Sequence, residues 1–161
     1  MTYLAWKEVP QSLQARITHA QLNTSLEPNC FGTAFFLLGV LPYDLVIYTG
    51  KGNVAKALKE MVLLDTPQNN CLAIASINKG IVHATYIESV LPFKGYQRKG
   101  AEGEFSHISS LTQIDEYIRS VPEWSDKRQT LSHSFYTLKD NDRLDSWAKD
   151  IVAQYHLGWD G

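Results

Sequence analysis

The chain has 161 residues, a length that fits one domain of ordinary size, and we assign residues 1–161 to a single domain. Fifteen basic and seventeen acidic side chains give a formal charge of −2, which supplies no positive field for phosphates and argues against a nucleic-acid or anionic-membrane protein. Hydrophobic residues make up 44% of the chain and charged residues 20%, a globular composition that excludes general disorder.

Helical spacing of apolar residues dominates the first half of the chain. It predicts helices within residues 10–22, 30–39 and 54–62. The second of these has apolar side chains almost all round and must therefore be buried on most sides. Residues 41–48 fit either a strand or the exit from that helix, and residues 50–53 predict a turn.

The second half changes to the patterns of strands. Strands are predicted at residues 71–77, 81–90, 95–99 and 131–138. A helix is expected over 109–118, and another carries Leu144 to Tyr155 after a cap at Asn141 or Asp142. Helices followed by a mostly antiparallel sheet with further helices predict an α+β fold.

The sequence also bears on the compartment. Its first residues, MTYLAWKEVPQSLQ, lack the basic and apolar regions of a signal peptide, and the longest apolar stretch is about half of a bilayer crossing. Two cysteines are too few for a disulfide framework and form no CxxC zinc pair. We expect a cytoplasmic protein, or one exported without a Sec-type signal peptide, with no membrane partner.

Cys30 is the candidate nucleophile. It follows Asn29 and opens the predicted buried helix, where backbone N–H groups point outward and the helix dipole favours an anion. Those conditions lower the pKa of a thiol and leave a thiolate at neutral pH. The alternative is a small buried hydrophobe, which is the commoner state of a free cysteine.

His83 is the candidate base. Strand alternation places it on one face with Ile81, Thr85 and Ile87, where it can lie against a helix N-terminus and take a proton from a thiol. Gln97 on the next strand is the candidate for a third group, because its side-chain oxygen can accept the far N–H of the imidazole. The alternatives are a core histidine bonded to a carbonyl group and a solvated glutamine.

Other polar residues are weaker candidates for a catalytic or binding role. His107 follows a glycine loop, His133 on another predicted strand is an alternative base, and Cys71 at the start of an apolar strand is expected to be inert. The glycine pairs at 50–53 and 100–103 lack the spacing of a phosphate loop. We therefore expect no cofactor and no metal.

Together these segments resemble the NlpC/P60 superfamily of papain-fold cysteine hydrolases. In that family a cysteine opens the first core helix, and an apolar strand, a turn and a strand bearing the catalytic histidine follow. Here Asn29-Cys30-Phe31-Gly32, CLAIASI and His83-Ala84-Thr85-Tyr86 come in that order, and Gln97 in GYQRKG takes the place of the polar third residue. Asn29 and Phe31 stand where the family usually has an acidic and a small residue.

The resemblance implies a papain-like core and a cysteine hydrolase that cleaves an amide or peptide bond through a thioester acyl-enzyme. Cys30 would attack, His83 would move the proton and Gln97 would orient His83. A peptidoglycan-type peptide or a related amide is the implied substrate class. The alternative is a catalytically inactive papain-fold binding module in which Cys30 and His83 serve packing or recognition.

Overall fold

The computed structural model describes residues 12–22, 26–100, 103–140 and 142–155. They form a mixed fold of helices and antiparallel sheet, which confirms the predicted α+β class. The helices are α1 (Leu13–Leu22), α2 (Cys30–Leu38), α3 (Asn53–Lys59), α4 (Leu111–Ser120), α5 (Asp145–Ala153) and the short 3-10 turns η2 (Thr49–Lys51) and η3 (Pro122–Trp124). The strands are β1 (Val62–Leu64), β2 (Cys71–Ile77), β3 (Gly80–Val90), β4 (Phe93–Arg98), β5 (Phe105–Ile108) and β6 (Leu131–Thr137).

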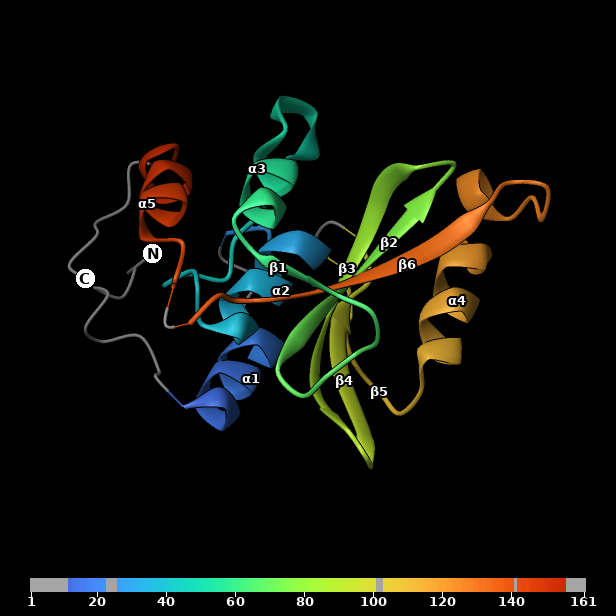
Figure 1. Ribbon diagram of the computed structural model, residues 1–161, viewed down its shortest axis with the longest axis horizontal. Coiled ribbons are helices and arrows are strands. Elements are labelled where there is room, and N and C mark those ends of the chain that lie inside the picture. The colour runs from blue at the N-terminus through green and yellow to red at the C-terminus, as the bar shows by residue number, and fades with distance from the viewer. Residues whose placement is uncertain (1–11, 23–25, 101–102, 141, 156–161) are drawn as a thin grey trace.

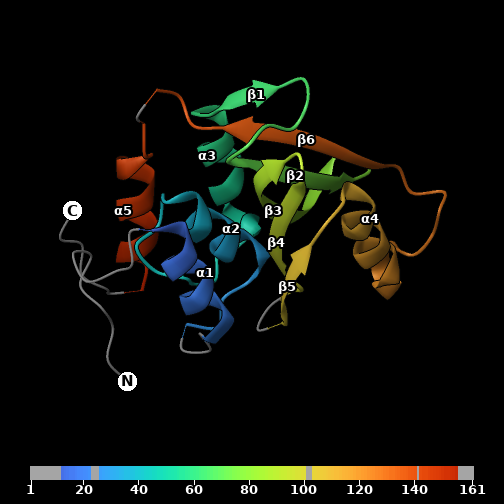
Figure 2. The ribbon, with the colours of Figure 1, turned by 90° about the horizontal axis from the view of Figure 1, so that it is seen from below.

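The sheet is the central layer of the molecule. Its six strands lie in the order β1-β6-β2-β3-β4-β5, and every neighbouring pair is antiparallel. Helices α1, α2, α3 and α5 lie on one side of the sheet, and α4 lies on the other (Figures 1 and 2). Strands β3 and β4, which carry two of the predicted site residues, are therefore enclosed between α2 and α4.

Two apolar clusters fill the spaces between these layers. Alternation along β2 directs Leu72 and Ile74 into the larger cluster under α2, and Ala73 and Ala75 into the smaller cluster under α4. All nine residues of α2 are buried, as its apolar sequence predicts, and Gly39 caps the end of the helix with a φ of 90°, which suits a glycine. Helix α2 is thus the core element of its layer.

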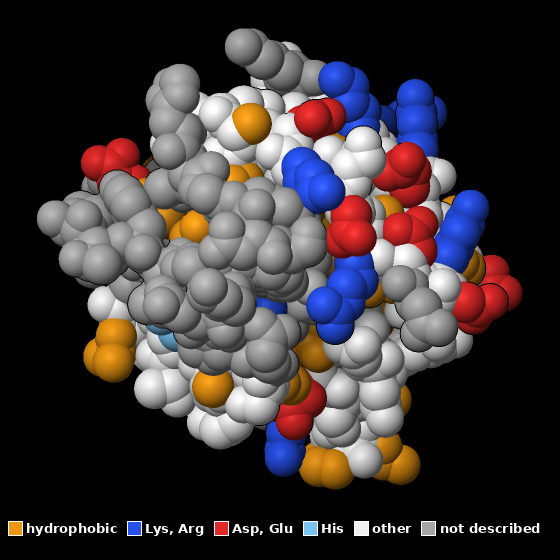
Figure 3. Space-filling model, turned by 90° about the vertical axis from the view of Figure 1, so that its left-hand side faces the viewer, with side chains coloured by type: hydrophobic (Ala, Val, Ile, Leu, Met, Phe, Trp, Pro, Cys, Tyr) orange, Lys and Arg blue, Asp and Glu red, His pale blue; other side chains and the backbone are white. Residues whose placement is uncertain are grey.

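The surface carries charges of both signs. On the face seen from the left of Figure 1, acidic and basic side chains are interspersed across the described atoms (Figure 3). No helix in the described ranges is long and apolar enough to cross a membrane.

Several elements differ from the sequence predictions. Helix α3 ends at Lys59, and Val62, predicted as helical, opens the edge strand β1 that pairs with β6. Strand β5 was not predicted, and residues 41–48 form no regular element. Leu144, with a φ of 55°, precedes α5 directly, while the Asp142 carboxylate accepts the Leu144 N–H at 2.8 Å. The alternative cap, Asn141, lies outside the described residues.

A β-bulge changes the faces of β3. Ser76 pairs with Ile81 and Ala75 pairs with His83, so Val82 is the extra residue. Ile81 consequently packs against the cluster under α2, and the prediction that it shares a face with His83 was wrong. His83 keeps the α4 face, where its ring lies 5.0 Å from that of Tyr117.

Candidate active site

Cys30 is the first residue of α2, as predicted, and Asn29 fixes that helix end. The Asn29 side-chain oxygen accepts the Gly32 N–H at 3.0 Å, which is the bond of an N-cap. The same oxygen accepts the Ile47 N–H at 3.1 Å, and the side-chain nitrogen donates to the Ile47 carbonyl at 2.8 Å. Asn29 therefore joins the start of α2 to the chain around Ile47.

Gly32 is required by a close approach of the backbone. A Cβ at this position would lie 1.5 Å from the carbonyl oxygen of Leu45. The side chain of any other residue would push apart the helix start and the segment that Asn29 holds to it. The spacing Asn29-Cys30-x-Gly32 thus positions the thiol, whatever chemistry the thiol performs.

We expect Gly32→Ala to destabilise the protein by about 1–3 kcal/mol, although alanine is the better helix former by about 1 kcal/mol. The clash with Leu45 involves backbone atoms, so no side-chain rotation can relieve it. Urea unfolding of the two proteins measures the difference. Gly50→Ala is the control, because nothing lies within 4 Å of its added Cβ; equal stabilities of the two variants would contradict the close approach.

The Cys30 thiol is buried, with only 5% of the residue exposed. Burial raises its pKa to about 12, and backbone N–H groups of Ala84, Phe31 and Cys30 itself oppose that shift. The prediction of a thiolate at neutral pH was wrong for this conformation, because loss of hydration outweighs the helix N-terminus. The neighbouring Ala84 N–H places the thiol next to the residue that follows His83, in the cluster under α2. The His83 ring points to the other side of β3, toward Tyr117 of α4, so the prediction that it lies against the start of α2 was wrong.

His83 and Gln97 lie together on adjacent antiparallel strands. Nε2 of His83 and Oε1 of Gln97 are 2.7 Å apart, so the imidazole donates and the amide oxygen accepts. The paired residues of β3 and β4 run from Val90 and Phe93 to Tyr86 and Tyr96. The bond between His83 and Gln97 therefore joins the two strands just beyond the point where their backbone pairing ends. In the same region, the Ala84 N–H approaches the Cys30 thiol.

The imidazole of His83 is neutral near pH 7. Only 1% of the residue is exposed, and burial lowers its pKa to about 4; the bond to Gln97 raises the pKa in part, and the charge of His133 lowers it further. The phenol of Tyr117 completes the group: burial raises its pKa, and so does the charge of a Cys30 thiolate. Cys30 and His83 are thus a protonated thiol and a neutral imidazole.

The lowered pKa of His83 makes stability depend on pH. Unfolding returns the imidazole to its ordinary pKa of 6.5, so the unfolded chain binds one proton more between pH 6.5 and about 4. Stability from this group is full above that window and falls as the pH falls through it, by about 2 kcal/mol between pH 7 and pH 5. Urea unfolding at both pH values should show that loss in the wild type and not in His83→Gln; equal losses would contradict a buried neutral imidazole.

A buried ion pair holds the end of β4 beside Gln97. Arg98 Nη2 lies 2.9 Å from the Asp44 carboxylate, and Arg98 Nε donates to Thr33 Oγ1 of α2 at 2.8 Å. Thr33 in turn donates to Asp44 at 2.6 Å, and Arg98 donates to the Ala20 carbonyl of α1 at 2.7 Å. These bonds link the end of β4 to the two helices and to the segment at Asp44. They therefore fix the position of Gln97, which precedes Arg98.

The remaining sequence candidates lie elsewhere. His107 is exposed and bonds Gln21 at 2.9 Å. His133 pairs with Asp115 of α4 and lies opposite Ala75, which separates it from His83 in the sheet. Cys71 is buried, and burial raises the pKa of its thiol, in agreement with an inert cysteine.

Sequence reasoning missed several supporting residues. Asn29 carries a capping signal that could have found it, because asparagine is among the residues preferred directly before a helix. Tyr117 gave no signal beyond its helix, because its approach to His83 depends on how α4 packs on the sheet. In the described part of the chain, no group of three His, Cys, Asp or Glu side chains is arranged to hold a metal ion.

Comparisons with known proteins identify no family for this chain. No protein-family model, no curated protein and no solved structure matches it.

Proposed function

We propose that this protein is a cysteine hydrolase that cleaves an amide or peptide bond. The observation that carries the proposal is the line of groups from Cys30 at the start of α2, past the Ala84 N–H, to His83 and its 2.7 Å bond to Gln97. A nucleophile at a helix N-terminus, a base and a group that orients the base are the parts that thiol catalysis needs.

The reaction proceeds through a thioester. As the sulfur of Cys30 attacks the carbonyl carbon, the thiol proton passes through one water to Nδ1 of His83, because Nε2 is bonded to Gln97. Backbone N–H groups at the start of α2 stabilise the oxyanion. His83 then gives the proton to the leaving amine, and water attacks the thioester with its proton passing to His83, which releases the acid and restores the thiol.

The uncharged state of the pair is compatible with this route. A thiol whose proton moves during attack needs no preformed thiolate, so a pKa of about 12 for Cys30 does not prevent acylation. Burial does require that substrate or solvent reach the sulfur, and solvent would bring the two pKa values closer together.

The order of the elements supports a papain-like assignment. A cysteine helix followed by antiparallel strands that carry a histidine and a polar third residue is the arrangement of the NlpC/P60 superfamily, in which a peptidoglycan-type peptide or a related amide would be the substrate. We include this assignment in the proposal.

Burial favours a second candidate, a catalytically inactive binding module. Cys30 is 5% exposed and His83 1%, and both ionisations are opposed by loss of hydration. In that case the two side chains serve packing.

The rates at which iodoacetamide alkylates the two cysteines distinguish these functions. For the hydrolase, we expect Cys30 at pH 7 to react at least about tenfold faster than Cys71, because His83 accepts the thiol proton. Digestion and mass spectrometry of both cysteine peptides give the two rates. Equal rates, or a faster Cys71, would favour the binding module.

Gln97→Ala should be milder than the loss of either reacting group. It removes one buried neutral hydrogen bond, worth about 0.5–1.5 kcal/mol, and so should slow acylation by a small ester about two- to thirteenfold. Stopped-flow rates with p-nitrophenyl acetate measure the effect. A loss as large as that of Cys30→Ala would mean that Gln97 contacts the reacting oxygen and does not only orient His83.

A further inference from the structure

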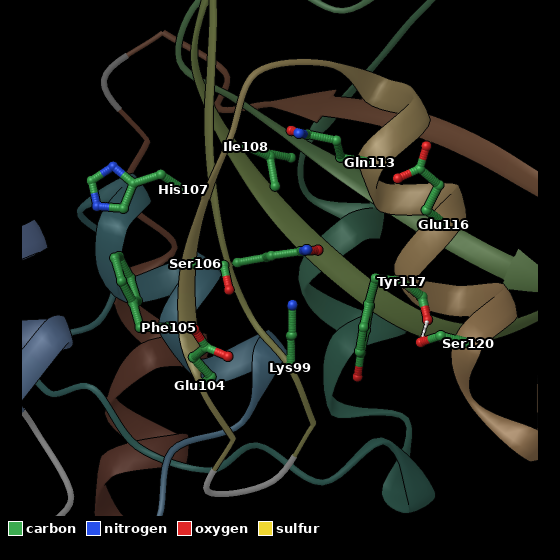
Figure 4. A pocket seen from close by; sticks show the side chains of 11 residues that line it. Lys99, Glu104, Phe105, Ser106, His107, Ile108, Gln113, Glu116, Tyr117 and Ser120 are labelled. Atoms are coloured by element: carbon green, nitrogen blue, oxygen red, sulfur yellow. Dashed lines mark hydrogen bonds between the residues drawn. The ribbon is translucent and has the colours of Figure 1, made fainter.

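A cavity of about 650 Å³ lies beside Gln97, between strands β4 and β5 and helix α4. Figure 4 shows that Lys99 approaches it from the segment after β4, Ser106 from β5 and Tyr117 from α4. Tyr117 links the cavity to the site, since its ring lies 5.0 Å from that of His83. The cavity therefore lies on the α4 side of the sheet, next to Gln97 and near His83.

Two polar atoms at this cavity are buried and have no hydrogen-bond partner. Gln97 is 1% exposed, its Oε1 is occupied by His83, and its Nε2 is unsatisfied. Ser106 lies directly opposite Gln97 in the sheet, and its hydroxyl oxygen is also unsatisfied. Leaving a buried donor unpaired is unfavourable, so such atoms in a cavity indicate a missing acceptor.

Lys99 adds a positive charge to these donors. Its ammonium lies 5.9 Å from the ring centre of Tyr117. No carboxylate among the described residues lies within 4.0 Å of the ammonium. The cation is therefore available to a ligand, alongside the amide N–H groups of Gln97 and the Ser106 hydroxyl.

The acidic residues of the cavity limit the kind of anion. Glu104 and Glu116 also line it, so two carboxylates accompany one ammonium. Neither glutamate forms an ion pair with Lys99, so the single ammonium matches one carboxylate, whose two oxygens accept the hydrogen bonds, and would leave a multiply charged anion such as phosphate partly uncompensated.

We propose that this cavity is a subsite for a carboxylate group of the substrate, held by Lys99, Gln97 and Ser106. Because the substrate role rests on the proposed function, Gln97 has two tasks: its oxygen orients His83 and its nitrogen binds the substrate. The preferred substrates are amides or peptides that carry a free carboxylate near the scissile bond.

The test measures binding without any reaction of Cys30. ¹⁵N-labelled protein is titrated with N-acetylglycine and N-acetyl-γ-aminobutyrate, each against its own primary amide, while the side-chain NH₂ signals of Gln97 are followed. We expect at least one acid to shift these signals and to bind at least about tenfold more tightly than its amide, since a charge-assisted hydrogen bond is stronger than a neutral one. Lys99→Gln should remove the preference, and Lys127→Gln, the same change at an exposed site, should keep it.

Equal effects of acids and amides, no shift of Gln97, or a preference that survives in Lys99→Gln would each overturn the proposal. These ligands carry no electrophile, so an inert Cys30 leaves the readout intact. Failure of the hydrolase assignment and failure of the carboxylate subsite are therefore distinguishable.

Discussion

Cys30→Ala is expected to abolish thioester formation with p-nitrophenyl acetate, because no other group in the site supplies the attacking electron pair. In the proposed reaction, the sulfur takes the acetyl group, p-nitrophenolate leaves, and His83 receives the thiol proton. Release of p-nitrophenolate is followed by absorbance, and the acetyl group is located by mass spectrometry of the digested protein.

Cys71→Ala is the matched control for this loss. Cys71 is also a buried thiol with a raised pKa, but it lies at the start of β2 and not at a helix N-terminus. The control should retain wild-type acylation, with folding of both variants checked by circular dichroism. A folded Cys30→Ala that still forms a thioester, or a Cys71→Ala that does not, would show that the wrong sulfur was chosen.

His83→Ala should slow acylation by about 10²- to 10⁴-fold, the contribution of a positioned general base. In the proposed mechanism, the variant loses both the acceptor of the thiol proton and the donor for the leaving group. Stopped-flow measurement with p-nitrophenyl acetate at pH 7 gives the rate constant. His83→Gln keeps more of the buried volume and should slow acylation as much. It serves as the second variant if His83→Ala does not fold.

His107→Ala is the control for the histidine prediction, because His107 is exposed on β5. Its acylation rate should equal that of the wild type. A folded His83→Ala with full activity would remove His83 from catalysis and make His107 or His133 the base to test next.

Local patterns in the sequence were sufficient to predict the helix and the strands that carry Cys30, His83 and Gln97. The apolar run after Cys30 predicted α2, and strand patterns around His83 and Gln97 predicted two neighbours in an antiparallel sheet. Hydrogen bonding of His83 to Gln97 then follows, because residues near the same end of adjacent strands lie within side-chain reach. These features depend on short stretches of chain.

Features that depend on distant segments could not be predicted in this way. The bulge at Val82 and the edge strand β5 arise from pairing with other strands, which the local pattern does not encode. The predicted protonation state of the Cys30 thiol was wrong for the same reason. A helix N-terminus is a local feature, whereas burial depends on all the segments packed around the thiol. The loss of hydration was the larger effect.

The most direct test of a catalytic Cys30–His83 pair is rapid mixing of the wild-type protein with excess p-nitrophenyl acetate. We expect a burst of p-nitrophenolate equal to one acetyl group per chain, located on Cys30, followed by slower steady release as water hydrolyses the thioester. Release without a burst, at the rate given by the urea-unfolded chain, would contradict the pair and leave Cys30 and His83 as packing residues.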